Sequence, residues 1–195
     1  CGLEQLLILI RIHAFRFTGK PKQQLLWEAH FLHHKQVGAR PTQELFAAVG
    51  GGSWGKSLPP QVPVLEELDV RQDILDQIDI LEFPLDSPFH LLQDQGIQGV
   101  KARELPQQLG KIVQVIGYLV TVKYTRTIKG EVMNFGTLID QEGNWIDTVH
   151  FPPTVKKYPF KGRAIYCLEG KVVEEFGFYS LEVQRMERMA YWNAE

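Results

Sequence analysis

The sequence predicts an α+β protein in which helices precede a small β barrel. In the first part of the chain, apolar residues recur at three- and four-residue spacing, which is typical of amphipathic helices. From residue 111 onward, β-branched runs alternate with Gly-containing turns, which indicates short strands. A hydrophobic content of 44% and a charged content of 23% are those of an ordinary folded domain.

Residues 1–36 predict a pair of helices. The segment RFTGK interrupts the apolar pattern, and Pro21 then stands where the first turn of a helix tolerates proline. We therefore expect the second helix over residues 21–36. The apolar faces consist of Leu3, Leu6, Leu7, Ile10 and Ala14 in the first helix, and of Leu25, Leu26, Ala29 and Leu32 in the second.

Residues 37–63 are rich in Gly and Pro and are predicted to be a flexible linker. Within them, GGGSWGKS at residues 50–57 matches the G-x-x-x-x-G-K-[ST] pattern of phosphate-binding loops. Such a loop needs a helix directly after its Lys-Ser end, because the helix dipole favours the phosphates. The following LPPQVPV contains three prolines that prevent this helix. No nucleotide site is therefore expected.

Residues 64–105 form an acidic helical segment. Pro84 and Pro88 end its first helix, and HLLQDQGI is expected to form a short second one. Because the carboxylates recur at helical spacing, we expect them on a solvated polar face rather than in a catalytic acid/base pair. The apolar stripe of the first helix comprises Leu65, Leu68, Ile74, Leu75 and Ile78.

Residues 106–195 predict five strands. The runs KIVQVIGYLVTVKYT, VMNFGTLID and WIDTVHF come first, joined by TIKGE and QEGN. PPTVKKYPFKG fits a short helix or an irregular link, and RAIYCLEGKVVEEF and FYSLEVQRMERM add two strands around Gly177. Gly117 permits strong coiling of the first strand. This order predicts a five-stranded Greek-key barrel of the OB type.

An OB barrel commonly binds single-stranded nucleic acid across its second and third strands, where aromatic rings stack on bases. If Leu138 points into the core, alternation places Phe135, Thr137 and Ile139 on the outer face of the second strand. Phe135 is therefore the predicted stacking ring. Asp140 follows this strand and precedes a Gly turn, where Asp is expected to make local hydrogen bonds.

The third strand is expected to point its large apolar residues inward. This phase also places Asp147 on the core side, so it requires a bulge. The predicted inward residues are Trp145, Val149 and Phe151, and the predicted outward residues are Ile146, Thr148 and His150.

The candidate nucleic-acid contacts combine this strand face with basic loops whose side chains would reach phosphates. The alternatives are that Phe135 packs in the core or against a protein, and that the lysines are only solvated. The candidates are Phe135, Thr137, Ile146 and His150 on the strands, and Lys123, Arg126, Lys129, Lys156 and Lys157 around the loops, with Lys161 and Arg163 nearby.

No catalytic residues, metal site or cofactor are predicted. Cys1 and Cys167 fit neither a disulfide framework nor a zinc motif, and the histidines at 30, 33 and 34 lack a suitably spaced carboxylate or cysteine. A net charge of −2 hides a basic stretch at 1–40 and an acidic one at 61–94, so nucleic-acid binding would need a local patch.

The cellular context is predicted from two further observations. No apolar run approaches the length of a bilayer span and no signal pattern opens the chain, so we expect a cytoplasmic protein without a membrane partner. The sequence begins at Cys1 without a methionine, and we expect it to be a piece of a longer protein.

Three separate stretches resemble one family, the alpha subunit of bacterial DNA polymerase III. VIGYLVTVKYTRTIKGEVMNFGTLIDQEGNWIDTVHFP resembles the OB domain near its C-terminus, with the family's "mxFxTLxD" strand and "vFP" ending. LILIRIHAFRFTGKPKQQLLWEA resembles the helices that follow its helix-hairpin-helix element, usually written "LIxxGAFD". DILDQIDILEFPLDSPFHLL is similar to the acidic segment with "LGxxLxxHPL" before the barrel.

The resemblance implies a role in chromosomal replication. The implied partners are single-stranded template DNA, the sliding clamp and other replicase subunits. The family's DNA-directed DNA polymerase aspartates, which carry the nucleotidyltransferase activity, and its phosphoesterase metal ligands lie in regions absent here. The chain is therefore not expected to polymerise DNA alone.

The linker also contains a candidate clamp-binding peptide. In this family a peptide of the type Q-x-[DS]-[LM]-F lies between the helices and the acidic segment, and TQELF at residues 42–46 occupies that place. Such peptides bury two apolar side chains from a flexible tether. The implied contacts are Gln43, Leu45 and Phe46, with Gln43 one residue closer to the Leu-Phe pair than usual.

Other departures from the family indicate a divergent bacterial lineage, and two alternative functions remain open on separate grounds. His13 stands where the family prefers Gly, and Glu82 and Phe89 depart from its "LG" and "HP" patterns. OB barrels of this sequence type also recognise anticodons in class II aminoacyl-tRNA synthetases. The third interpretation is an OB domain that docks proteins, which the near-neutral charge favours.

Overall fold

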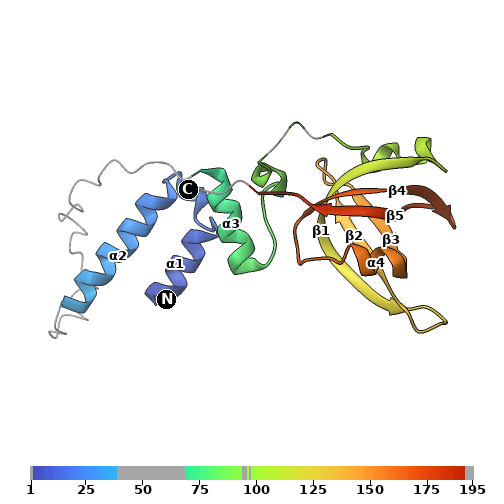
Figure 1. Ribbon diagram of the computed structural model, residues 1–195. Coiled ribbons are helices and arrows are strands. Elements are labelled where there is room, and N and C mark those ends of the chain that lie inside the picture. Colours follow the sequence, from blue (N-terminus) through green and yellow to red (C-terminus); the bar gives the residue numbers. More distant parts are fainter. Residues whose placement is uncertain (1, 39–68, 94–95, 97, 192–195) are drawn as a thin grey trace. The chain divides into compact units, whose positions relative to one another are not determined.

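The chain forms two compact units, Cys1–Asp86 and Ser87–Glu195, in a computed structural model that describes residues 2–38, 69–93, 96 and 98–191 (Figure 1). The predicted acidic segment 64–105 contributes residues to both units. No helix in these described ranges has the length and apolar character that a bilayer crossing requires.

The first unit contains three α-helices: α1 (Leu3–Arg11), α2 (Lys22–Gly38) and α3 (Val70–Leu81). α1 packs against both α2 and α3, and a 3₁₀ turn, η1 (Arg16–Thr18), separates α1 from α2 as the RFTGK segment predicts. The Asp69 carboxylate accepts the Arg71 N–H and caps the start of α3. The predicted helices are confirmed where the structure describes them.

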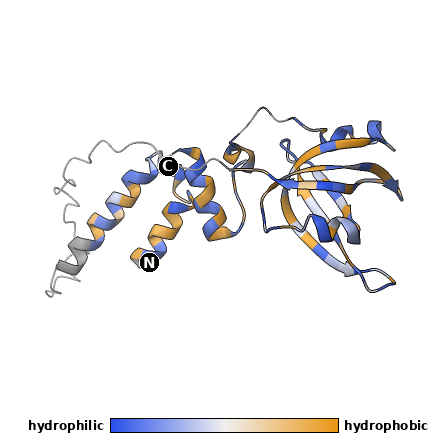
Figure 2. Ribbon diagram, viewed as in Figure 1, coloured by the Kyte–Doolittle hydropathy of each residue, from blue (hydrophilic) through white to orange (hydrophobic). Residues whose placement is uncertain are grey.

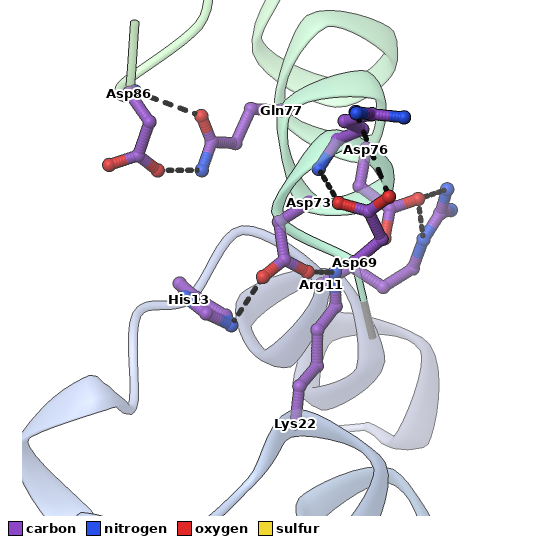
Figure 3. Close-up of polar contacts among 9 residues, drawn as sticks. Arg11, His13, Lys22, Asp69, Asp73, Asp76, Gln77 and Asp86 are labelled. Atoms are coloured by element: carbon purple, nitrogen blue, oxygen red, sulfur yellow. Dashed lines mark hydrogen bonds and ion pairs between the residues drawn. The ribbon is translucent and has the colours of Figure 1, made fainter. Parts of the chain in front are cut away.

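A buried cluster of charges joins the three helices (Figure 3). Lys22, whose side chain is 3% exposed, donates to Asp73 at 2.7 Å and to Asp76 at 2.5 Å. Arg11 reaches Asp76 at 2.7 Å, and His13 lies 3.2 Å from Asp73. Burial alone would raise the pKa of the Asp76 carboxyl, but hydrogen bonds from Lys22 and Arg11 outweigh it and lower the pKa.

The prediction of a solvated acidic face is therefore wrong for the centre of α3. The helix buries Ile74 as predicted, but it also buries Asp76 and Gln77. The Gln77 amide donates to Asp86 at 2.8 Å, and its oxygen accepts the Leu85 N–H at 2.7 Å. Gln77 thus holds the chain where it turns away from α3.

Two non-glycine residues of the first unit have a left-handed backbone conformation. His13 follows α1 with φ 61°, and Glu82 ends α3 with φ 64°. This conformation costs an ordinary residue roughly 1–2 kcal/mol relative to right-handed backbone, and glycine adopts it freely. Glycine would therefore fit both positions with less strain.

The second unit is a closed barrel of five strands, so the predicted OB fold is confirmed (Figure 1). The strands are β1 (Ile112–Arg126), β2 (Val132–Ile139), β3 (Trp145–His150), β4 (Ile165–Glu175) and β5 (Phe178–Arg188). They neighbour one another in the order β1-β2-β3-β5-β4, with β3 and β5 parallel and the other pairs antiparallel. The predicted link after the third strand contains α4 (Pro152–Lys157).

One close approach and one register shift between β1 and β2 shape the barrel. A Cβ atom on Gly117 would lie 2.9 Å from the Leu138 Cβ, so glycine lets β1 cross closely over β2. The β1–β2 register shifts between Leu119 and Thr121, where a bulge increases the local bend. Gly117 therefore permits the predicted coiling of β1, because a side chain at this position would clash with Leu138 of β2.

The barrel interior is filled by one apolar cluster, which includes Val115, Leu119, Leu138, Ile146, Tyr166, Leu168 and Leu181. Hydrophobic and hydrophilic residues alternate along the strands in Figure 2, because successive side chains point to opposite sides of the wall. The 3₁₀ segment η4 (Ala102–Gln108) adds the buried Leu105 to this cluster.

A second apolar cluster covers part of the outer wall. Phe89 and Leu92, in and after the 3₁₀ segment η3 (Pro88–Leu91), pack on Ile116 and Tyr118 of β1 and on Ile165 of β4. HLLQDQGI was expected to be a short helix, and its first residues end this 3₁₀ turn. The part of the outer wall around Ile116, Tyr118 and Ile165 is therefore covered by the chain itself.

Candidate nucleic-acid interface

The outer face of β2 and β3 carries a row of side chains centred on Phe135. Phe135 pairs with Lys123 of β1 on one side and with Val149 of β3 on the other. Its ring is 40% exposed, whereas Leu138 on the same strand is fully buried. The predicted outward direction of Phe135 is confirmed, and its ring has a cation beside it.

A row of polar side chains lies next to it on the same face. Thr121 pairs with Thr137, Thr137 with Asp147, and Asp147 with Ser180 of β5. The Thr137 hydroxyl donates to Asp147 Oδ1 at 2.9 Å. The Asp147 carboxylate is exposed and is held in one orientation by this hydrogen bond.

A third row begins with Ile139, which pairs with Trp145. The Trp145 side chain is 63% exposed. Phe178, the first residue of β5, is also exposed. The face therefore has one aromatic region around Phe135 and a second around Trp145.

The turns that flank this face carry further exposed apolar residues. Ile128 is fully exposed in the turn between β1 and β2. Phe176, 98% exposed, lies in the β4–β5 turn with φ 54°, followed by Gly177 with φ 83°. Two successive left-handed residues match a type I′ hairpin turn, where Asn-Gly is usual and a bulky residue is an outlier.

The predicted phase of β3 is wrong. Ile146, Thr148 and His150 are each 1% exposed and point into the barrel, while Trp145 and Asp147 point outward. The β2–β3 register continues from Asn134–His150 to Ile139–Trp145, so the bulge required by the prediction is not formed there. Ile146 and His150 are therefore core residues and cannot contact nucleic acid on the outer face.

Trp145 is the functional candidate that sequence reasoning missed, although the sequence contained the signal. A charged Asp147 in the core would be strongly unfavourable without a partner. The phase that exposes Asp147 also exposes Trp145 and buries Thr148 and His150. These two polar residues bond inside the barrel: Thr148 Oγ1 donates to the Gly136 carbonyl at 2.9 Å and lies 3.0 Å from His150 Nε2.

His150 is held in a neutral state by its surroundings. Its ring packs 4.6 Å from that of Phe160, and no described residue bonds to its Nδ1 atom. Burial lowers the pKa of His150 to about 4, because a charged imidazole would be desolvated. The side chain is therefore neutral at pH 7.

The predicted cations lie in two places: on β1 and its turn to β2, and on α4. Lys123 flanks Phe135, and Arg126 donates to the Gly130 carbonyl at 3.4 Å in the turn that also carries Lys129. On α4, Lys156 lies 3.5 Å from the Glu131 carboxylate, and Lys157 lies 5.2 Å from the Tyr158 ring centre. Lys123 is thus the predicted cation that the register places directly beside the stacking ring.

Asp140 fixes the turn between β2 and β3. Its carboxylate accepts the N–H groups of Ala102, Glu142 and Asn144 at 3.0, 2.9 and 2.8 Å. Burial would raise the pKa of the Asp140 carboxyl, but these N–H donors outweigh it and lower the pKa. The predicted local hydrogen bonding is confirmed, and Asp140 sets the start of β3 and hence the position of Trp145.

The residues predicted to bind the sliding clamp, Gln43, Leu45 and Phe46, and the GGGSWGKS segment lie outside the described residues.

The chain matches no protein-family model and no curated protein. Among solved structures it is similar to the single-stranded DNA binding protein from Thermus aquaticus, at 17% identity over 45% of this chain, with a TM-score of 0.39. The match covers 43% of the Thermus protein, which is less than half of its length.

Two other similar structures are covered almost completely. One is the mitochondrial single-stranded DNA binding protein of S. cerevisiae, at 12% identity over 43% of this chain and 98% of that chain, with a TM-score of 0.35. The other is an OBody bound to hen egg-white lysozyme, at 13% identity over 49% of this chain and 96% of that chain, with a TM-score of 0.39.

Proposed function

We propose that the barrel binds single-stranded nucleic acid across the outer face of β2 and β3. The observation that carries this proposal is the exposure of Phe135 and Trp145 on neighbouring strands of one face. Bases of any sequence can stack on such rings, and cations nearby attract the phosphates. Lys123 beside Phe135 and Lys129 in the adjacent turn supply that charge.

The spacing of the two rings fits a strand that crosses the face. Phe135 pairs with Val149, and Trp145 lies four residues from Val149 along β3. At a rise of about 3.3 Å per residue and a strand separation of about 4.8 Å, the backbones at the two rings are about 14 Å apart. The rings would therefore stack on separate bases, with the polar row of Thr137 and Asp147 between them.

The test is fluorescence anisotropy of a labelled single-stranded oligodeoxynucleotide mixed with the whole chain. Phe135→Ala and Trp145→Ala should each weaken binding about tenfold, since stacking contributes about 1–3 kcal/mol per base. Phe17→Ala is the matched control, because it removes an exposed ring from the first unit. Affinity should also fall as salt rises. Salt-insensitive binding, or binding that neither barrel variant changes, would contradict the proposal.

The finer assignment is that the chain is part of a DNA polymerase III alpha subunit. It rests on the three sequence resemblances, and the backbone at His13 and Glu82 supports it. Both residues have left-handed φ values, and both stand where the resembling family has glycine. The complete reading frame tests the assignment: polymerase aspartates should be encoded upstream, and a synthetase catalytic domain next to the barrel would overturn it.

On this assignment, residues 42–46 bind the sliding clamp through Leu45 and Phe46, with Gln43 as a polar contact. The immobilised peptide TQELF should retain the clamp of the same organism. The Phe46→Ala peptide should lose it, because one of the two buried anchors is gone. Equal retention by both peptides, or by neither, would remove the clamp from the proposed partners.

A protein-docking role is the second candidate, and the turns favour it. Ile128 and Phe176 are almost completely exposed, and apolar side chains at turn tips suit a protein pocket as well as a base. In the anisotropy experiment this candidate predicts no oligonucleotide binding. A marked preference for one tRNA over the oligodeoxynucleotide would instead favour the anticodon-binding alternative.

A further inference from the structure

We infer that Asp147 makes this face selective for guanine in single-stranded nucleic acid. The inference rests on the proposed function, because it concerns which base stacks on Phe135 or Trp145 with its edge towards Asp147. Asp is depleted in strands. Here it occupies the middle of the exposed face, where the Thr137–Asp147 pair separates the Phe135–Val149 pair from the Ile139–Trp145 pair.

The carboxylate of Asp147 is both accessible and oriented. Its side chain is exposed on β3, and Oδ1 accepts the Thr137 hydroxyl at 2.9 Å. Thr121 and Ser180 extend the same row on either side, so small hydroxyl side chains border this part of the face. A base stacked on Phe135 or Trp145 would therefore bring its edge towards a carboxylate with little steric obstruction.

A carboxylate only accepts hydrogen bonds, so it selects bases by the donors on their edges. Guanine presents N1–H and the N2 amino group side by side, which matches the two oxygens of a carboxylate. Adenine and cytosine present one amino donor next to a ring nitrogen acceptor, and thymine presents N3–H between two carbonyl oxygens. In these three bases a carbonyl or lone pair faces one carboxylate oxygen and repels it.

The charge of Asp147 also directs the path of the backbone. Phosphates are repelled from the middle row and attracted towards Lys123 and Lys129 at the β1–β2 end. The sugar-phosphate chain therefore runs along the edge of the face while the base edges point inward to Asp147. This arrangement allows the carboxylate to read a base.

The experiment compares oligo-dT with oligo-dT that carries isolated guanines, using anisotropy and the whole chain. The guanine-containing strand should bind about tenfold more tightly, as expected for one bidentate contact to a base. Replacing guanine by inosine, which lacks the N2 amino group, should remove most of this preference. Asp147→Asn should abolish the preference and, because it removes a charge that repels phosphates, should also tighten the binding of oligo-dT.

Glu182→Gln is the matched control, because Glu182 faces the same side and pairs with Val149 next to Asp147. Removing its charge should tighten the binding of all strands alike and leave the ratio of guanine to thymine affinity unchanged. If all strands bind the wild-type chain equally and Phe135→Ala still weakens them, the selectivity is refuted and the proposed function stands. If no strand binds, both are refuted.

Discussion

Acidification should destabilise the barrel through His150, because this side chain must lose a proton when the chain folds. In the unfolded chain, a histidine titrates with an ordinary pKa of about 6.5. In the barrel, burial lowers the pKa of His150 to about 4. Between these values the unfolded chain binds a proton that the folded chain excludes, so stability falls as the pH falls.

The magnitude follows from the two pKa values. Each pKa unit corresponds to 1.36 kcal/mol, and integrating the two titrations gives a loss of about 2 kcal/mol at pH 5 and about 3 kcal/mol at pH 4, relative to pH 7. The loss levels off below the folded pKa, where both states are protonated. The folded state cannot avoid it by rotating the ring, because Nε2 lies 3.0 Å from Thr148 Oγ1 and Nδ1 has no described partner.

Urea unfolding at several pH values, followed by amide NMR signals of β2 and β4, measures this effect on the barrel alone. The free energy of unfolding of His150→Leu should fall less steeply with acidification than that of the wild-type chain. Between pH 7 and pH 4, the difference between the two free energies should shift by about 3 kcal/mol in favour of the variant. Carboxylates such as Asp140 titrate equally in both chains and cancel. Parallel pH profiles, or an NMR titration of His150 with a midpoint near 6.5, would refute the reasoning.

Three further predictions concern single residues. Lys22→Met should lower the free energy of unfolding of the first unit, measured by urea titration, by about 3–5 kcal/mol, because the carboxylates of Asp73 and Asp76 lose their shared cation. Lys20→Met is the control: it removes an exposed ion pair and should cost less than about 1 kcal/mol in the same titration. Glu82→Gly should raise that free energy by about 1 kcal/mol, measured in the same way, by relieving left-handed backbone. Asp140→Asn should destabilise the barrel by about 1–3 kcal/mol at neutral pH. This last difference should shrink as the pH falls through the lowered pKa of Asp140, since protonation removes the same acceptor from the wild-type carboxyl.

The sequence predicts the strands well because each depends on local signals. β-branched runs, the turn glycines and the helical link give the order of the barrel without knowledge of long-range contacts. The predicted phase of β3 is wrong because it weights side-chain size above charge: it places Trp145 in the core and requires a bulge at Asp147. Burial of one carboxylate costs more than exposure of one indole, so the charged residue decides the phase.

The charge cluster of the first unit lies beyond such reasoning. Lys22 is separated from Asp73 by 51 residues and from Asp76 by 54, and the helical spacing of the carboxylates is equally compatible with solvent. Which carboxylates are buried depends on how α3 rotates against α1 and α2, and this is set by Ile74 and the packing of all three helices. Local sequence patterns do not specify this rotation.

The position of the proposed binding face follows from what the second unit leaves uncovered. A closed barrel has outward side chains all round, and Ile116, Tyr118 and Ile165 on β1 and β4 pack against Phe89 and Leu92. On β2, β3 and β5 the aromatic residues Phe135, Trp145 and Phe178 stay exposed instead. A second apolar surface docking here would have to bury the charged Asp147 carboxylate and would supply no donor beyond the Thr137 hydroxyl, which is unfavourable. A stacked base with N–H groups on its edge would cover an aromatic ring and also donate hydrogen bonds to the Asp147 carboxylate. The exposed residues of this face therefore favour a nucleic acid over an apolar partner.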